Sequence, residues 1–358
     1  MVEAKLQEVF RVGANERPAA IAALVTEASA ADLISIIGVV ASEQASIQDA
    51  KPVLEAIAKT KVPKLKNNDC IAVCEAAMSK LEPRKQFFAK EDALFRRGMV
   101  DVYDARDDFY EAVQMLKGIT YDGDCYEEKI EDWLNLATYQ FEMKDSTAAE
   151  TFVNKVMHIL HHTEDNDKIL RYRMAYAKVQ DSNRDFLNAA QGYYNASNLT
   201  GVDGEQVTEL LDCALTCTIL APAGPRKARL LAILYSDERI KSNQFYDLLA
   251  KIFNGEVIRK EHVAEFKQKL EDFQNITMTD GYSVLERALI EHNIVVISKI
   301  YMNIRFSELG NFLGIQPEQA EDFIANMVEQ GRIQAVLDQE NELVEFEEEG
   351  RQQQTFND

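Results

Sequence analysis

The spacing of the prolines is the feature that most constrains how this chain can fold. Its seven prolines leave two long stretches, residues 84–221 and 226–316, without a single one. A proline inside a helix removes a backbone donor and clashes with the preceding turn, so long stretches without proline favour continuous helical structure. We therefore expect a mainly α-helical protein.

A short motif recurs in the first of these stretches. An aspartate followed four residues later by an alanine occurs at Asp108, Asp145 and Asp185, and these aspartates lie 37 and 40 residues apart. Each follows an expected helix, over residues 91–103, 127–141 and 167–179, and opens a second one, as a capping acid before a small residue would. The period is typical of a superhelix of tetratricopeptide-like (TPR-like) repeats, in which helical hairpins stack. We expect such a helical-repeat arm over residues 1–200.

The C-terminal part changes pattern. After a helical segment at residues 201–278, we expect helices over residues 284–299, 307–313 and 317–330, the last two closed by Gly314 and Gly331. Apolar residues at 333–337 and 343–346 flank a polar turn and predict a two-stranded hairpin. Three helices and a hairpin predict a winged-helix module over residues 279–346. The acidic, glutamine-rich residues 347–358 predict a disordered tail.

Charge argues against nucleic acid as a partner. The 358 residues include 60 acidic and 39 basic side chains, a formal net charge of −21. Residues 279–358 alone carry 16 acidic and 5 basic residues, and the third expected helix of the winged module contains four acids and no lysine or arginine. In DNA-binding winged helices this element enters the major groove, where such charge would be repelled by phosphate. We expect the module to contact protein.

Membrane insertion and secretion are also not expected. No apolar run approaches the roughly 20 residues that a membrane helix needs. Polar and charged residues are scattered through the first twenty positions, unlike a signal peptide. The five cysteines are an odd number in a long chain, which indicates reduced thiols in the cytoplasm and nucleus.

Motifs for catalysis, cofactor binding or metal binding are weak throughout. The sequence has no glycine-rich phosphate loop, no GxSxG and no HExxH. Three sets of residues could be imagined as metal ligands, but each lacks the spacing or the further ligands of a known site. They are His158, His161 and His162; Cys70, Cys74, Cys213 and Cys217; and Asp122, Asp124 and Glu127. We expect a helix end for the histidines, buried packing for the cysteines and a solvated turn for the acids. We expect no enzyme activity.

Glu291 and His292 could in principle form a general acid/base pair. Neighbouring residues on a helix point about 100 degrees apart, so the two side chains do not face each other. We expect His292 to be a structural residue that holds the first winged-module helix against its neighbours.

A partner interface is expected on the small sheet of the winged module. An open sheet edge can accept a strand from another protein. The residues placed at this interface are Ile333, Val336, Leu343, Val344 and Phe346. We expect one alternate set of side chains to cover the helices and the edge of the second strand to remain open.

Several segments resemble the PCI-domain family, in which a helical-repeat superhelix ends in an acidic winged helix. The resemblance runs from about residue 167 to residue 346, roughly half of the chain. Its most specific segments are Cys217–Gly224, Arg229–Arg239, Ser283–Asn293, Ser298–Tyr301 and Glu329–Arg332. PCI proteins occur in the proteasome lid, the COP9 signalosome and a translation initiation factor complex. The segments are most similar to the signalosome branch of the family.

The resemblance implies a non-catalytic scaffold of the COP9 signalosome, the complex that removes the ubiquitin-like modifier Nedd8 from cullins. Its implied partners are other PCI subunits, the metalloprotease-like subunits and cullin-RING ligases, which the N-terminal arm would help to recognise. The isopeptidase metal centre of the complex requires a His-x-His pair, and the five histidines here contain none. Family members usually continue past the wing into a long helix, whereas twelve residues follow Phe346 here.

Two alternatives share parts of this pattern. A scaffold of the 26S proteasome regulatory lid would carry the same Glu291–Asn293 element and the same Ser298–Lys299 step. A PCI-type nucleic-acid-binding adaptor would have the same architecture with different charge.

Overall fold

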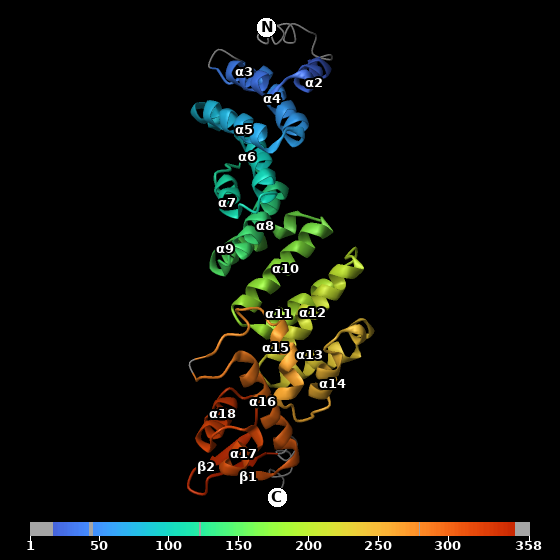
Figure 1. The fold of residues 1–358 in the computed structure, drawn as a ribbon, viewed down its shortest axis with the longest axis vertical. Helices are drawn as coiled ribbons and strands as arrows, with labels where there is room; N and C mark the ends of the chain where they lie inside the picture. Colours follow the sequence, from blue (N-terminus) through green and yellow to red (C-terminus); the bar gives the residue numbers. More distant parts are fainter. Residues whose placement is uncertain (1–16, 43–45, 122, 279, 348–358) are drawn as a thin grey trace, which may run out of the picture. The chain divides into compact units, whose positions relative to one another are not determined.

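The computed structural model describes residues 17–42, 46–121, 123–278 and 280–347, and the chain divides into two compact units, residues 1–164 and 165–358. Figure 1 labels the elements in chain order. The expected fold class is confirmed, because helical repeats are followed by a winged helix with one small sheet. The domain boundaries expected at residues 200, 278 and 346 rest on the sequence pattern, whereas these two units are defined by their internal contacts. The expected boundaries therefore stay a prediction.

The first unit is built from helices that pack against their neighbours in sequence. They are α2 (Arg17–Glu27), α3 (Ala30–Val40), α4 (Ile47–Ala56), a π-helical turn (Ile57–Lys61), short 3₁₀ helices at Val62–Lys64 and Glu82–Phe87, α5 (Asn67–Leu81), α6 (Ala89–Asp104), α7 (Phe109–Lys117), α8 (Tyr126–Glu142), α9 (Ser146–Ile159) and a 3₁₀ turn (Leu160–His162).

The second unit continues with α10 (Asn166–Ser182), α11 (Phe186–Ser197), α12 (Gly204–Leu220), α13 (Pro225–Ser236), a 3₁₀ helix (Glu238–Ser242), α14 (Tyr246–Phe253), a 3₁₀ turn (Lys260–Val263) and α15 (Ala264–Lys269). It ends with α16 (Val284–Ile300), β1 (Asn303–Arg305), α17 (Phe306–Leu313), α18 (Pro317–Glu329), β2 (Ala335–Asp338) and β3 (Leu343–Phe346). The three expected helices of the winged module are therefore confirmed as α16, α17 and α18.

The Asp-x-x-x-Ala motif marks the same backbone turn three times. The residue before each aspartate, Asp107, Lys144 or Arg184, has a left-handed backbone with φ between 57° and 63°. Each aspartate then donates its backbone N–H to the carbonyl five residues earlier, at 2.9–3.0 Å. This pairing satisfies a carbonyl that the end of a helix would leave open. The alanine of each motif is fully buried, so the second helix lies close against the first.

Helix α16 is shared by two apolar cores of the second unit. Leu285 and Leu289 belong to the core formed by α10 to α15, whereas Ile290, Ile294 and Ile297 belong to the core of the winged module. A helix that is apolar around most of its circumference is a buried helix. The winged module therefore packs directly on the preceding helices through α16.

The small sheet contains one more strand than the sequence predicted. Its order is β1-β3-β2, and both β1 and β2 pair with β3 in antiparallel register, with Ile304 and Leu337 opposite Val344. The expected hairpin is confirmed as β2 and β3, but its second strand lies in the centre of the sheet. The expectation of an open edge beside Val344 is wrong, because the unforeseen strand β1 covers that edge.

Two expectations fall outside the described residues: the disordered tail at 348–358 and the contribution of Asp122 to a calcium site. Among the described helices, none is both long enough and apolar enough to cross a bilayer.

The left-handed turn residues generate a stability prediction. A non-glycine residue in this conformation costs ~1–2 kcal/mol, which exceeds the ~0.5–1 kcal/mol entropic penalty of glycine. We expect Lys144→Gly to be more stable than Lys144→Ala by ~0.5–1 kcal/mol. Urea unfolding followed through Trp133, the chain's one tryptophan, measures this difference. Equal stabilities of the two variants would mean that the turn is not strained.

Candidate functional site

The winged module is held in place by three consecutive residues of α16, Glu291, His292 and Asn293. All three are buried, with 2–8% of their surface exposed. Because adjacent helix positions point about 100 degrees apart, each side chain reaches a different neighbour. These three residues and their partners are called the α16 junction below.

Glu291 connects the module to the loop between α12 and α13. Its Oε2 accepts a hydrogen bond from the backbone N–H of Ala223 at 3.0 Å. Arg332, which follows α18, donates both Nη1 and Nη2 to the Glu291 carboxylate and donates Nη1 to the carbonyl of Ala223 at 3.2 Å. A buried carboxylate needs such pairing, and a bidentate arginine supplies it.

A buried lysine also bonds the segment between α12 and α13 that Glu291 contacts. Lys227 is 3% exposed and donates Nζ to the carbonyls of Ile219 and Ala221, at 2.9 and 2.8 Å. Burial lowers its pKa to about 8, and the nearby charge of Glu291 partly opposes this decrease. Lys227 thus accounts for carbonyls near the C-terminal end of α12 that have no partner within the helix.

His292 and Asn293 hold the segment after α14. The Nε2 of His292 lies 2.9 Å from the carbonyl of Glu256, and since a carbonyl only accepts, this nitrogen carries the proton. Asn293 accepts from the backbone N–H of Ile258 and donates to its carbonyl, both at 2.9 Å. The expected structural role of His292 is confirmed by this contact.

The structure separates the five residues predicted to form a partner interface. Val344 and Phe346 are buried in the module core, and Ile333 packs partly against it. The alternation of β3 places Leu343 on the opposite face, and Val336 lies across the ladder from Glu345 with 52% of its surface exposed. Only Val336 and Leu343 therefore offer side chains on the outer face of the sheet.

The open edges of the sheet belong to β1 and β2. Phe346 donates its N–H to Met302, and Phe306 donates to Glu342, so these residues of β1 and its flanks face β3. Because antiparallel strands alternate, Asn303 and Arg305 direct their backbone groups away from the sheet. Within the part of the chain that the structure describes, no strand pairs with this edge of β1.

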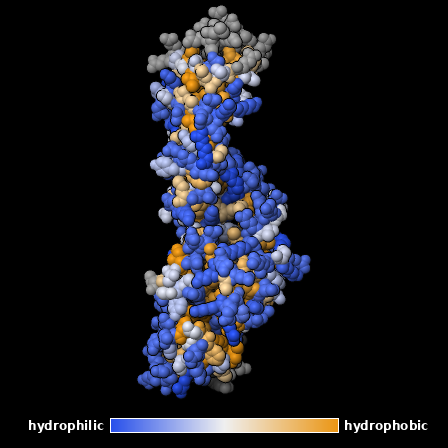
Figure 2. Space-filling model, viewed as in Figure 1, coloured by the Kyte–Doolittle hydropathy of each residue, from blue (hydrophilic) through white to orange (hydrophobic). Residues whose placement is uncertain are grey.

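An exposed apolar patch, which the sequence analysis missed, lies beside this edge. Ile300, Met302 and Phe312 are 58–69% exposed, Tyr301 is 39% exposed, and the rings of Tyr301 and Phe312 are 6.0 Å apart. Figure 2 shows hydrophobic surface at the end of the chain where α17 and β1 lie. Such exposed clusters of large apolar residues are typical of surfaces that contact other proteins. The signal in the sequence was the Ile-Tyr-Met run, which begins at the last residue of α16.

The residues considered as metal ligands have other contacts. The ring of His162 stacks on Tyr126 at 3.8 Å and lies 4.0 Å from His161. None of the five cysteines, all of which the structure describes, forms a disulfide, and Cys70, Cys74 and Cys217 are buried. Within the described ranges, no group of three or more His, Cys, Asp or Glu side chains is arranged to hold a metal ion.

Two family models match the chain. The model described as PSMD12/CSN4, N-terminal, covers residues 16–205, which is more than half of the chain. The model of the PCI domain covers residues 260–348, which contain α16 and the sheet.

Curated proteins from distant organisms are similar over most of the chain. The COP9 signalosome complex subunit 4 of Emericella nidulans is 35% identical over 327 residues, 88% of this chain and 80% of that protein. The subunit 4 of Arabidopsis thaliana is 33% identical, over 77% of this chain and 72% of its own. The subunit 4 of Dictyostelium discoideum is also 33% identical, over 76% of this chain and 70% of that protein.

The burial of His292 generates a pH prediction. Burial lowers its pKa to about 4, and the charges of Lys227 and Lys299 act in the same direction. The unfolded chain binds this proton near pH 6.5 and the folded chain does not, so stability falls as the pH falls below 6.5. We expect the stability advantage of the native chain over His292→Gln to shrink by ~1 kcal/mol between pH 7 and pH 5.5.

Urea unfolding followed by circular dichroism at both pH values measures this change. A pH-independent difference between the two proteins would contradict the assignment of a buried, neutral His292.

Proposed function

Because the chain belongs to the family of COP9 signalosome subunit 4, we propose that it is a non-catalytic scaffold subunit of a COP9 signalosome. The observation that carries this proposal is the similarity to subunit 4 proteins over most of the chain. The N-terminal family model covers both the signalosome and the proteasome branch, so it does not separate them. The similarity to subunit 4 proteins favours the signalosome.

The scaffold role accounts for how the second unit is built. The α16 junction fixes the winged module on the preceding helices, and the module then presents an open strand edge and an apolar patch. Together these features suit assembly with another protein. We place this protein in the cytoplasm and nucleus, where it would support recognition of cullin-RING ligases while the metalloprotease-like subunits remove Nedd8.

Affinity purification of the tagged chain tests the proposal. We expect signalosome subunits, including the isopeptidase subunit, to co-purify with it. Recovery of proteasome base and lid subunits instead would replace this proposal with the proteasome alternative.

We further propose that the partner strand docks on β1 and the apolar patch, rather than on all five residues predicted from the sequence. Lys299 and Arg305 are both exposed; Lys299 directly precedes the Ile300–Met302 run, and Arg305 lies three residues after it. The edge therefore fits the winged helix of a neighbouring PCI subunit whose strand carries apolar and acidic side chains. Val336 and Leu343 on the outer face would lie at the rim of the contact.

Met302→Asp tests this surface directly. An aspartate in a desolvated contact has no partner for its charge, so we expect binding to neighbouring subunits to weaken at least ~10-fold. Co-purification of reconstituted subunits is the measurement, and unchanged circular dichroism shows that the fold is intact.

Met157→Asp on α9 is a matched control, because Met157 is also well exposed. Undiminished binding of Met302→Asp, or an equal loss in the control, would move the interface away from the patch.

The charge of α18 yields a second expectation, which separates this proposal from a nucleic-acid adaptor. Glu318, Asp322 and Glu329 are exposed on this helix. Carboxylates on the helix that would enter the groove repel phosphate, so we expect negligible affinity for DNA or RNA at physiological salt. An anisotropy titration that gives submicromolar, salt-dependent binding would favour the adaptor.

A further inference from the structure

A shallow groove between α11 and α13 is lined by apolar side chains and a few polar ones. It forms a hollow of about 440 Å³ lined by Tyr194 of α11 and by Ala232, Ile233, Ser236 and Asp237 at the end of α13. Ile233 is 39% exposed, which is unusual for an isoleucine in a packed helix pair. The volume is in the range of small-ligand pockets and is enough for one or two apolar side chains.

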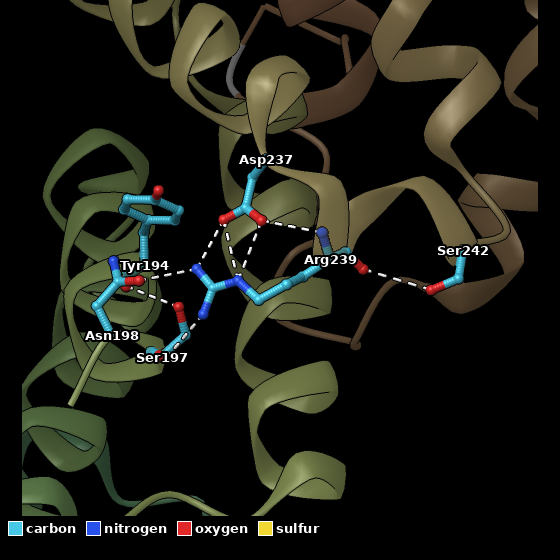
Figure 3. A network of polar contacts seen from close by, with 6 residues as sticks. All are labelled: Tyr194, Ser197, Asn198, Asp237, Arg239 and Ser242. Carbon is cyan, nitrogen blue, oxygen red and sulfur yellow. Dashed lines mark hydrogen bonds and ion pairs between the residues drawn. The ribbon is translucent and has the colours of Figure 1, made fainter. Parts of the chain in front are cut away.

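Arg239 makes several polar contacts beside the groove residues Tyr194 and Asp237, as Figure 3 shows. The guanidinium of Arg239 bonds both carboxylate oxygens of Asp237, at 2.6–3.2 Å. It also donates to the carbonyl of Ser197 and to Asn198 Oδ1, at 3.0 and 2.8 Å. These bonds tie the C-terminal end of α11 to the turn after α13. The groove is therefore preformed, which lowers the entropic cost of binding.

The helix α13 beside the groove is basic, whereas the chain as a whole is acidic, and Asp237 is the one charged residue that lines the hollow itself. Helix α11 contains no Asp, Glu, Lys, Arg or His, and α13 contains three basic residues and no acidic one, in a chain with a net charge of −21. Arg226 and Arg229 are exposed, while Lys227 is buried in the α16 junction. The flanking carboxylates are engaged, since Asp185 caps α11 and Asp237 pairs with Arg239.

The spacing of the arginines and the isoleucine on α13 indicates which peptide sequence would fit the groove. Arg226, Arg229 and Ile233 follow at intervals of three and four residues, so they form one stripe on the helix. At a rise of about 1.5 Å per residue, the two arginines lie roughly 10 and 6 Å from Ile233 along the axis. In an extended peptide, with a rise of about 3.3 Å per residue, these distances correspond to positions three and two residues from an anchor in the hollow.

We propose that this groove binds an extended acidic segment of a partner protein. An apolar side chain of the segment enters the hollow beside Tyr194 and Ile233, and carboxylates two and three residues before it pair with Arg229 and Arg226. The surface is separate from the open edge of β1, so it serves a second contact rather than the assembly of winged helices.

The test uses a fluorescein-labelled peptide with the core Glu-Glu-Ser-Leu in a glycine-serine background, titrated with the full chain. We expect saturable binding that weakens at least ~10-fold when the leucine is replaced by alanine or the glutamates by glutamine. Ile233→Asp and Arg229→Glu should each cause a loss of the same size. Fluorescence anisotropy is the measurement.

Matched controls are Ile34→Asp and Arg173→Glu, which change exposed residues of the same types on α3 and α10. We expect both to bind the peptide like the native chain. The proposal is overturned by an absence of saturable binding up to ~1 mM peptide. It is equally overturned if the groove variants bind the peptide as tightly as the controls do. The same holds if a peptide with lysines in place of the two glutamates binds as tightly as the acidic peptide.

Discussion

The position of the winged module depends on a buried ion pair. Glu291 and Arg332 close a bidentate contact over the backbone of Ala223, and this contact joins α16, the end of α18 and the loop after α12. Removal of one partner from such a pair leaves an uncompensated buried charge and costs ~3–5 kcal/mol. His292 and Asn293 extend the same junction to the segment after α14. The assembly surface that we propose belongs to this module, so the junction also fixes its position on the preceding helices.

Much of this architecture was readable in the sequence because it depends on local signals. The left-handed turns at Asp107, Lys144 and Arg184 repeat with the aspartate motif, and Gly314 and Gly331 end α17 and α18. The helices of the winged module follow from such caps and from apolar periodicity. The structural role of His292 could be predicted because adjacent helix residues cannot face each other.

The surface that we propose for a partner could not be predicted in the same way. Strand β1 is three residues long and pairs with β3 across about forty residues, so its existence depends on tertiary contact rather than local preference. Without β1, Val344 seemed to lie at an edge, whereas it is in the centre of the sheet. The run Ile300–Met302 follows the helix expected over residues 284–299 and received no role, because sequence periodicity does not show which apolar residues beyond a helix are exposed.

A double-mutant cycle on Glu291 and Arg332 tests most directly whether this ion pair holds the module on the preceding helices. Opening free energies of α12, α16 and α18 from hydrogen exchange would be compared for the native chain, Glu291→Leu, Arg332→Met and the double variant. The account predicts that each single variant loses protection in all three helices together, with a coupling energy of at least ~2 kcal/mol. Additive effects within ~0.5 kcal/mol, or loss confined to α16, would contradict it.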